Sequence, residues 1–220
     1  MEINDFIKSS ADLVPTIKLL LILTFLMFLP AVVFMMTSFV RIIIAFSFTK
    51  SAIGVTQNIP NQILIGLAIF MTIFIMSPVA KEINETALKP YMEQTIDTET
   101  ALEAAQKPIR KFLLSQTLEK DLQLFVNTSG LDKEEVTKDN IPLSVLIPAF
   151  AISELKTGFQ IGFIIYLPFI VIDLFISSCL TAMGMFMLPP AMIATPLKLL
   201  LFILIDGWNL LSQALIVSFN

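Results

Sequence analysis

Residues 159–217 read FQIGFIIYLPFIVIDLFISSCLTAMGMFMLPPAMIATPLKLLLFILIDGWNLLSQALIV, an almost continuous apolar sequence. The stretch is long enough for membrane helices, yet Asp173, Lys198 and Asp206 interrupt it. An ionisable side chain at the centre of a bilayer costs roughly 3 kcal/mol, so such residues normally face a protein interior, a partner subunit or a water-filled path. We therefore expect this stretch to form one wall of a larger assembly.

The composition of the whole chain indicates an integral membrane protein. Of the 220 residues, 56% are hydrophobic, with 19 Phe and 11 Met, and the mean hydropathy is +0.84. These values lie outside the range of an ordinary soluble domain. Residues 81–140 hold eight Lys/Arg and twelve Asp/Glu, so one acidic insert separates the apolar regions. Nucleic-acid binding is disfavoured, because no basic stripe with interleaved aromatic residues occurs.

The residue types exclude several kinds of catalytic and metal site. The chain has no histidine, and Cys179 is its only cysteine. Intrachain disulfides, histidine metal sites, Cys–His pairs and Ser-His-Asp triads therefore cannot form. Cys179 is most simply a small core residue. The N-terminus has neither a basic n-region nor a small-residue cleavage pattern, so we expect no removable signal peptide. No catalytic residue, cofactor or metal ligand is predicted.

Four hydrophobic regions predict an all-α fold, a helical integral membrane subunit with bent helices or hairpins. They are residues 19–36, 63–80, 143–188 and 197–219. The first region would extend roughly 27 Å as a helix and nearly cross a bilayer core. The fourth carries Asp206, Asn209 and Gln213, which gives its helix a polar side.

A shorter apolar run, residues 39–48, contains Arg41 and is too short to cross a bilayer. We expect it to continue a helix and to lead into a turn around Gly54 and Pro60. The chain thus divides into three parts. They are N-terminal membrane and assembly helices (1–80), a soluble helical insert (81–140), and C-terminal helices with a pore-closing loop (141–220).

The insert predicts two amphipathic helices. The first follows Asp97, a candidate N-cap, and contains Pro108, which should bend it. The second ends near Gly130, a candidate C-cap. The pair is too small for an independent enzyme domain and is expected to be a solvated cap. Because Arg41 and Lys50 lie between the first two spans, the positive-inside rule places the N-terminus and the acidic insert on the non-cytoplasmic side.

The segment Met183-Gly-Met-Phe-Met-Leu-Pro-Pro190 is the most suggestive local cluster. Methionine is flexible and polarizable, so a ring of such side chains from several subunits would close against itself yet yield to a passing chain. The alternative is ordinary core filling. Gly184 and the two prolines favour a non-helical break, which lipid tolerates only where the backbone faces protein or a cavity. Met185, Phe186 and Met187 are therefore candidates for a deformable seal.

The charges in the apolar regions allow two readings. Asp173 and Asp206 are candidate proton-relay or cation-site carboxylates. Alternatively they pair with cations and lock subunits together, which we prefer because an unpaired buried charge costs more than a paired one. The cations available for pairing are Arg41, Lys156 and Lys198. Glu154 and Lys156 flank one residue and so point to different helix faces, which suits contacts with two different neighbours.

Seven stretches of the sequence carry a resemblance to a known family. The matching stretches are Met35–Ile42, Pro60–Ala68, Phe74–Pro78, Pro148–Phe163, Pro168–Asp173, Met183–Pro190 and Asp206–Trp208. In this order and over nearly the whole chain, they resemble the FliP/SctR family of type III export-gate proteins. The Thr-Ser-Phe-Val-Arg version that ends at Arg41 is more similar to the flagellar branch than to the injectisome branch.

This resemblance implies a non-enzymatic helical subunit in the inner membrane, at the flagellar basal body. Several copies would form a ring with FliQ-like and FliR-like proteins, next to FlhA/FlhB-like export components. The ring would be the entry channel for unfolded flagellar proteins, closed by a loop that falls on Met185, Phe186 and Met187. The resemblance also implies that much of the apolar sequence lies within a raised conical assembly, so four hydrophobic regions need not mean four membrane crossings.

Two residues depart from the family pattern. Phe186 stands where a third methionine is expected, and Ile59 stands before Pro60 where a proline pair is common. Phenylalanine keeps the seal apolar but is stiffer than methionine, so the three loop positions are not equivalent.

A rival function is a small ion or proton transporter that uses Asp173 and Asp206. Transporters often contain internal repeats, and the two halves of this chain have no convincing repeat. An intramembrane enzyme is a poorer alternative, because a chain without histidine lacks the usual base and metal ligand.

Overall fold

The computed structural model describes residues 33–55, 59–130 and 140–219, together with isolated positions between residues 19 and 30. These described residues form helices and connecting loops without any strand, which confirms the all-α class. Within the predicted span at residues 19–36, positions 21, 22, 25, 29, 31 and 32 lie outside them. The helices are α2 (Phe39–Ile53), α3 (Asn61–Ile83), the π-helical η1 (Asn84–Leu88), α4 (Lys89–Met92), α5 (Thr98–Gln116), α6 (Glu119–Thr128), α7 (Leu143–Ala182), α8 (Ala191–Leu204) and α9 (Gly207–Val217).

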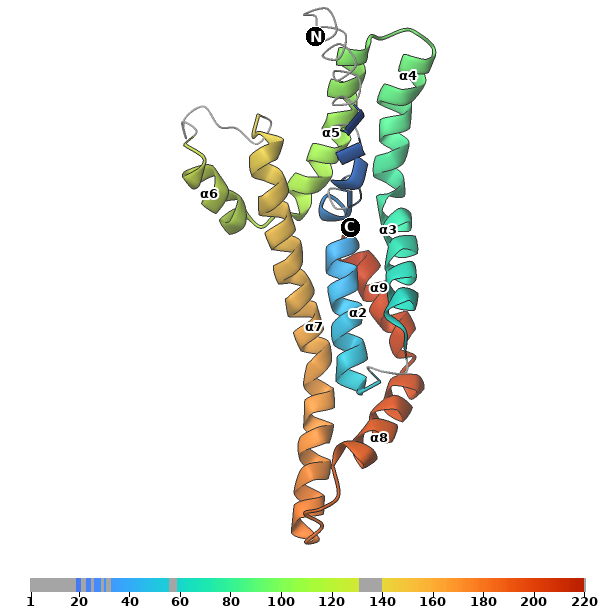
Figure 1. The fold of residues 1–220 in the computed structure, drawn as a ribbon, viewed down its shortest axis with the longest axis vertical. Helices are drawn as coiled ribbons and strands as arrows, with labels where there is room; N and C mark the ends of the chain where they lie inside the picture. Colours follow the sequence, from blue (N-terminus) through green and yellow to red (C-terminus); the bar gives the residue numbers. More distant parts are fainter. Residues whose placement is uncertain are drawn as a thin grey trace, which may run out of the picture.

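Among the described residues, two continuous helical stretches are long and apolar enough to cross a membrane. They are residues 61–92, where α3, η1 and α4 follow one another, and residues 143–182, which are α7. The pair α8 and α9 makes a third candidate, bent by 62° at its break. Figure 1 shows α7 running along most of the length of the molecule, with α2 between α7 and α3.

Two helix boundaries differ from those that the sequence predicts. The second span is predicted to end at Ala80, but the helix continues to Met92 and contains Pro78, since a long apolar helix tolerates one internal proline. The fourth hydrophobic region is predicted to carry one helix, and this is wrong. The chain breaks between α8 and α9, where Asp206 adopts a left-handed backbone with a φ of 51°.

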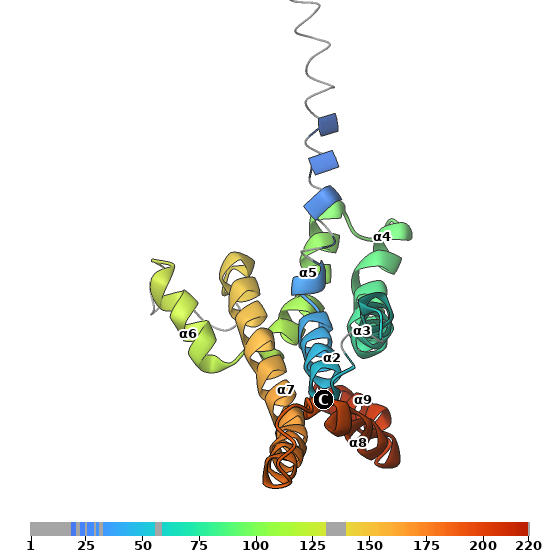
Figure 2. The ribbon, with the colours of Figure 1, turned by 60° about the horizontal axis from the view of Figure 1, so that its bottom comes forward.

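The tightest helix packing joins α2 to α7, which lie side by side in both ribbon views (Figure 2). Gly158 and Gly162, one turn apart on α7, form the contact face. A Cβ atom at Gly162 would lie 2.5 Å from Cγ of Phe48, and one at Gly158 would lie 3.3 Å from Cα of Arg41. Small residues at this spacing let helix backbones approach closely. Glycine at both positions therefore sets the separation of α2 and α7.

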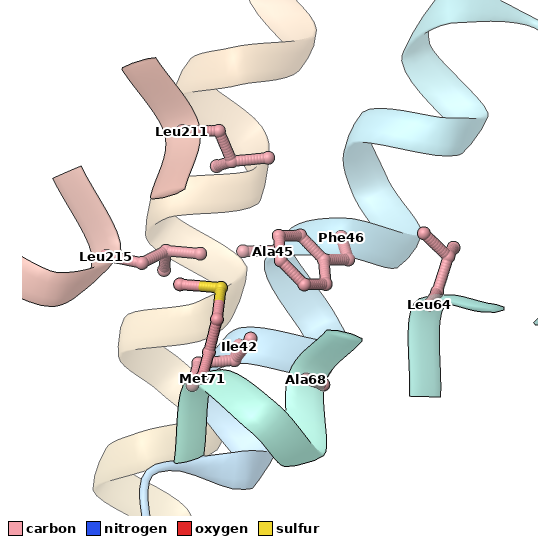
Figure 3. Packing of buried hydrophobic residues seen from close by; sticks show 8 residues of the cluster. All are labelled: Ile42, Ala45, Phe46, Leu64, Ala68, Met71, Leu211 and Leu215. Atoms are coloured by element: carbon pink, nitrogen blue, oxygen red, sulfur yellow. The ribbon is translucent and has the colours of Figure 1, made fainter. Parts of the chain in front are cut away.

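The main hydrophobic core surrounds α2. Figure 3 shows one cluster in which α2 packs against α3 and α9. It consists of Ile42, Ala45, Phe46, Leu64, Ala68, Met71, Leu211 and Leu215. A second cluster joins the end of α2 to α7 and α8 and consists of Ala52, Ile53, Val55, Phe169 and Phe202. Because α2 contributes to both clusters, it is the central element around which the longer helices are placed.

Both predicted helices of the insert are present. The Asp97 carboxylate caps α5 by accepting the Thr100 N–H at 3.1 Å, and hydrogen bonds from Thr100 hold the pKa of Asp97 below its usual range. This cap stabilises the fold above the ordinary carboxyl pKa and is lost as the pH falls through the lowered one. Helix α5 continues through Pro108, and Gly130 follows α6 with a φ of 72°.

The insert packs directly on the first turns of α7. Their shared cluster consists of Leu113, Ile141, Val145, Leu146 and Phe150. The Arg110 guanidinium also donates to the carbonyl of Ile141. The division of the chain at residues 80 and 140 stays a prediction, but these contacts fix where α5 lies relative to α7.

Candidate functional site

The loop between α7 and α8, residues 183–190, has the non-helical backbone that its sequence predicts. Helix α7 ends in a Schellman motif, in which the Met185 N–H donates to Leu180 O at 2.9 Å and the Gly184 N–H donates to Thr181 O at 3.0 Å. Gly184 makes this possible because it adopts a φ of 74°, which a residue without Cβ accepts readily. The loop then enters α8 through Pro190.

The three candidate seal residues project from this loop. Met185 is 41% exposed, Phe186 is 77% exposed and Met187 is 96% exposed. The loop lies at one extreme end of the molecule, where α7 turns back into α8 (Figure 1). Large apolar side chains gathered at the tip of a protein usually mark an interaction site, because water solvates them poorly. The core-filling alternative does not fit the position of these three residues within the single chain.

Arg41 is buried and holds four segments together. Its Nε donates to Glu154 Oε2 on α7 at 3.1 Å, and its Nη2 donates to the other oxygen of that carboxylate. Nη2 also donates to Gln116 Oε1 at the end of α5 at 3.1 Å. Nη1 donates to the carbonyl and the hydroxyl of Ser218 at 3.0 and 3.1 Å. The guanidinium carbon lies 3.8 Å from the centroid of the Phe219 ring.

This arrangement makes the Arg41–Glu154 pair a structural junction. The side chain of Arg41 is 3% exposed and that of Glu154 is 0% exposed. A bidentate guanidinium–carboxylate pair is geometrically specific, and removing one partner of a buried pair costs about 3–5 kcal/mol. The acid that pairs with Arg41 is thus Glu154 and neither Asp173 nor Asp206.

Lys156 contacts a different neighbour from Glu154, as their spacing predicts. Its Nζ lies 3.6 Å from Asp121 Oδ1 in the first turn of α6. Ser153, fully buried on α7, donates to the other oxygen of Asp121 at 2.9 Å and accepts the Leu118 N–H at 3.0 Å. Glu154 therefore joins α7 to α2, whereas Ser153 and Lys156 join α7 to the insert.

Lys198 and Asp173 form the third junction. The Lys198 ammonium donates to Asp173 Oδ2 and to the carbonyl of Ala52 at 3.1 Å. That carbonyl lies in the last turn of α2, where the helix dipole favours a cation. The side chain of Lys198 is 7% exposed, but that of Asp173 is 44% exposed. The pair thus ties α7, α8 and α2 together and leaves part of the carboxylate accessible.

Asp206 is placed differently from the other predicted acids. It is exposed at the break between α8 and α9, and its Oδ2 accepts a hydrogen bond from Asn209 Nδ2 at 3.0 Å. Among the described residues, no salt bridge includes Asp206. The structure therefore brings Asp173 to Lys198 but leaves Asp206 without a cation.

The sequence model of the FliP family matches residues 22–215. The chain belongs to the FliP family. Flagellar biosynthetic protein FliP of Bacillus subtilis is 49% identical over an aligned length of 221 residues, and the alignment covers 98% of this chain and 100% of that protein. The FliP of Pectobacterium carotovorum is 47% identical, covering 93% of this chain and 79% of that protein. The FliP of Aquifex aeolicus is 40% identical, covering 95% of this chain and 88% of that protein.

Membership of the FliP family agrees with the long apolar helices described above. The chain is a helical membrane protein of the flagellar export system, as the family resemblance implies.

Several residues of this FliP family chain have structural roles that the sequence analysis does not predict. Gly158 and Gly162 have a recognisable signal, because two glycines four apart in an apolar helix favour close helix packing. Gln116, which also donates to Phe219 O at 3.3 Å, and Ser153 have no such signal. Their partners are distant in sequence, and only the packed fold brings them together. Cys179, expected in the core, is exposed.

Proposed function

We propose that the chain is a structural channel subunit of the flagellar type III export gate and is not an enzyme. Several copies form a ring with FliQ-like and FliR-like partners, next to FlhA/FlhB-like components, in the bacterial cytoplasmic membrane. Unfolded flagellar proteins enter export through this ring, with the insert on the non-cytoplasmic side. Support comes from the FliP family match over residues 22–215 and from the long apolar helices.

The observation that carries the pore proposal is the exposure of Met185, Phe186 and Met187 at the tip of the α7–α8 turn. A single chain gives these side chains no apolar environment. In a ring, the same loop from each copy meets its equivalents, and the apolar side chains exclude water and ions from the axis. Because methionine side chains are flexible, an incoming polypeptide displaces them without breaking covalent or polar contacts.

The charged residues support a role in assembly. Arg41–Glu154 and Lys198–Asp173 hold α2, α7, α8 and the insert in fixed relation, so that the loop is presented at a defined position. Asp173 is half-exposed and keeps acceptor capacity that a neighbouring subunit can use. We therefore assign Arg41, Glu154, Lys156, Asp173 and Lys198 to building and joining subunits.

The test replaces Met185, Phe186 and Met187 together by alanine in cells that export flagellar proteins. We expect increased leak of small ions across the cytoplasmic membrane with secretion retained, because the side chains that fill the axis are gone while the backbone path remains. Met192→Ala is the matched control, since Met192 is 66% exposed but lies in α8 beyond the loop. A tight membrane in the triple variant would place the seal elsewhere in the assembly.

A further inference from the structure

An apolar groove runs between α7 and the bent pair α8–α9. Its volume is about 420 Å³, and its floor reaches Thr49 of α2. Ile164, Pro168 and Phe169 line it from α7, while Leu201, Ile205 and Leu210 line it from α8 and α9. Ile164 is 66% exposed and Leu210 is 54% exposed, so the groove is open at its rim.

The groove offers its occupant no free side-chain hydrogen-bond donor at its floor. Among the described residues that line the groove, Thr49 alone has a polar side chain, and its hydroxyl already donates to Ala45 O at 2.8 Å. An occupant must therefore present an apolar surface to the groove itself. Alkyl and aromatic side chains from a helix satisfy this requirement.

A negative charge lies at the rim of the groove. Asp206 stands between Ile205 and Gly207, which both line the groove. Within the described part of the chain, its carboxylate has only the neutral Asn209 amide as a partner. The other two acids in the described part of residues 140–219 are different, because Glu154 is bound by Arg41 and Asp173 by Lys198. The N-terminus of α9 partly offsets the charge of Asp206 but does not neutralise it.

We propose that this groove receives an apolar helix of another membrane protein, and that a Lys or Arg on that helix pairs with Asp206. The proposal rests on the proposed function and specifies the chemistry of one partner in the assembly. Charge complementarity excludes an acidic segment, and phosphate-bearing lipids would place negative charge beside Asp206. A second copy fits poorly, because the described cations of its helices α2, α3, α7 and α8 already have partners. Arg41, Lys50 and Lys198 are buried and hydrogen-bonded. The exposed Lys156 and Lys81 lie 3.6 Å from Asp121 and 3.9 Å from Glu85.

The experiment places the photo-crosslinking residue benzoyl-phenylalanine at Leu210 in the full chain, in native membranes that contain the complete export system. A matched probe at Ile203, which is 65% exposed on α8 but does not line the groove, is the control. We expect Leu210 to give an adduct whose partner peptide is a membrane helix with a Lys or Arg. Ile203 should not give that adduct.

Asp206→Asn then tests the charge. Asparagine tolerates the left-handed backbone at this position and can still accept the Asn209 hydrogen bond, so the variant removes little except the charge. The Leu210 adduct should fall roughly ten-fold, as expected when one charge-assisted contact is lost. Asp206→Lys combined with an acidic substitution of the partner's basic residue should restore it.

The proposal is overturned if the Leu210 adduct is a lipid, joins two copies of this chain, or survives Asp206→Asn unchanged. It is also overturned if charge reversal on both sides fails to restore the adduct while each protein is present in the membrane at its normal level. The proposed function is judged separately by ion leak through the loop variant. A failed groove experiment with a leaking triple-alanine variant would therefore reject only the partner assignment.

Discussion

At the scale of single residues, the Arg41–Glu154 pair is the most sensitive point of the structure. Glu154→Gln would leave the Arg41 guanidinium buried without a counter-charge, and we expect a loss of about 3–5 kcal/mol in folding free energy. The measurement is resistance of the purified complex to thermal unfolding in detergent. The control is Glu85→Gln, because the Lys81–Glu85 pair has side chains 76% and 62% exposed and a separation of 3.9 Å. Equal melting of the two variants would contradict the junction role.

Residue identity alone could predict only part of this chemistry. Burying an unpaired charge costs free energy, so charged residues within apolar sequence are expected to pair with opposite charges. The structure pairs Asp173 with Lys198 in this way. The choice of Glu154 for Arg41 could not be predicted, because the two residues are 113 positions apart and depend on how α2 meets α7. Asp206 lacks a cation for a related reason, since the backbone break turns it outward at the junction of two helices.

At the scale of elements, the glycine face between α2 and α7 gives a matched pair of substitutions. Gly162→Ala would place a methyl group 2.5 Å from the Phe48 ring and should destabilise the protein by about 1–3 kcal/mol. Gly66→Ala, in α3, meets nothing within 4 Å and should be neutral or slightly stabilising. Protease sensitivity in membranes distinguishes them. If Phe48→Ala restores the stability that Gly162→Ala removes, the clash lies between residues 162 and 48. If Gly162→Ala has no effect on stability, α2 and α7 can move apart to accommodate the methyl group.

The helices show which sequence signals are strong. Helices α5 and α6 of the insert could be predicted with their caps, because Asp97 and Gly130 stand where helix ends require such residues. The break at residues 205 and 206 had a signal in the Asp206–Gly207 dipeptide, a frequent turn sequence, but the surrounding apolar run concealed it. Helix α7 continues through Pro148 and Pro168, within the third hydrophobic region that the sequence predicts.

At the scale of the whole molecule, substitution of Asp173 distinguishes two hypotheses for the function of the protein, a channel subunit and an ion transporter. Asp173→Asn weakens the contact with Lys198 and removes the exposed negative charge, so we expect fewer complete rings with no specific loss of ion coupling. The measurement compares the amount of assembled complex in native gels with proton flux in vesicles. Lost flux with normal assembly would instead support the transporter. Glu103→Gln, a charge removal on the insert away from these junctions, is a suitable control.

The length of α7 sets a scale for the exported polypeptide. Its 40 residues extend about 60 Å, roughly twice the hydrocarbon thickness of a bilayer. In a ring of the proposed kind, an extended polypeptide passing beside α7 from end to end would place about 18 residues alongside it at once. A substrate therefore needs an unfolded leading segment longer than a bilayer alone would require, and a stalled fusion protein with a shorter leader should stop before its tip clears the far end of α7.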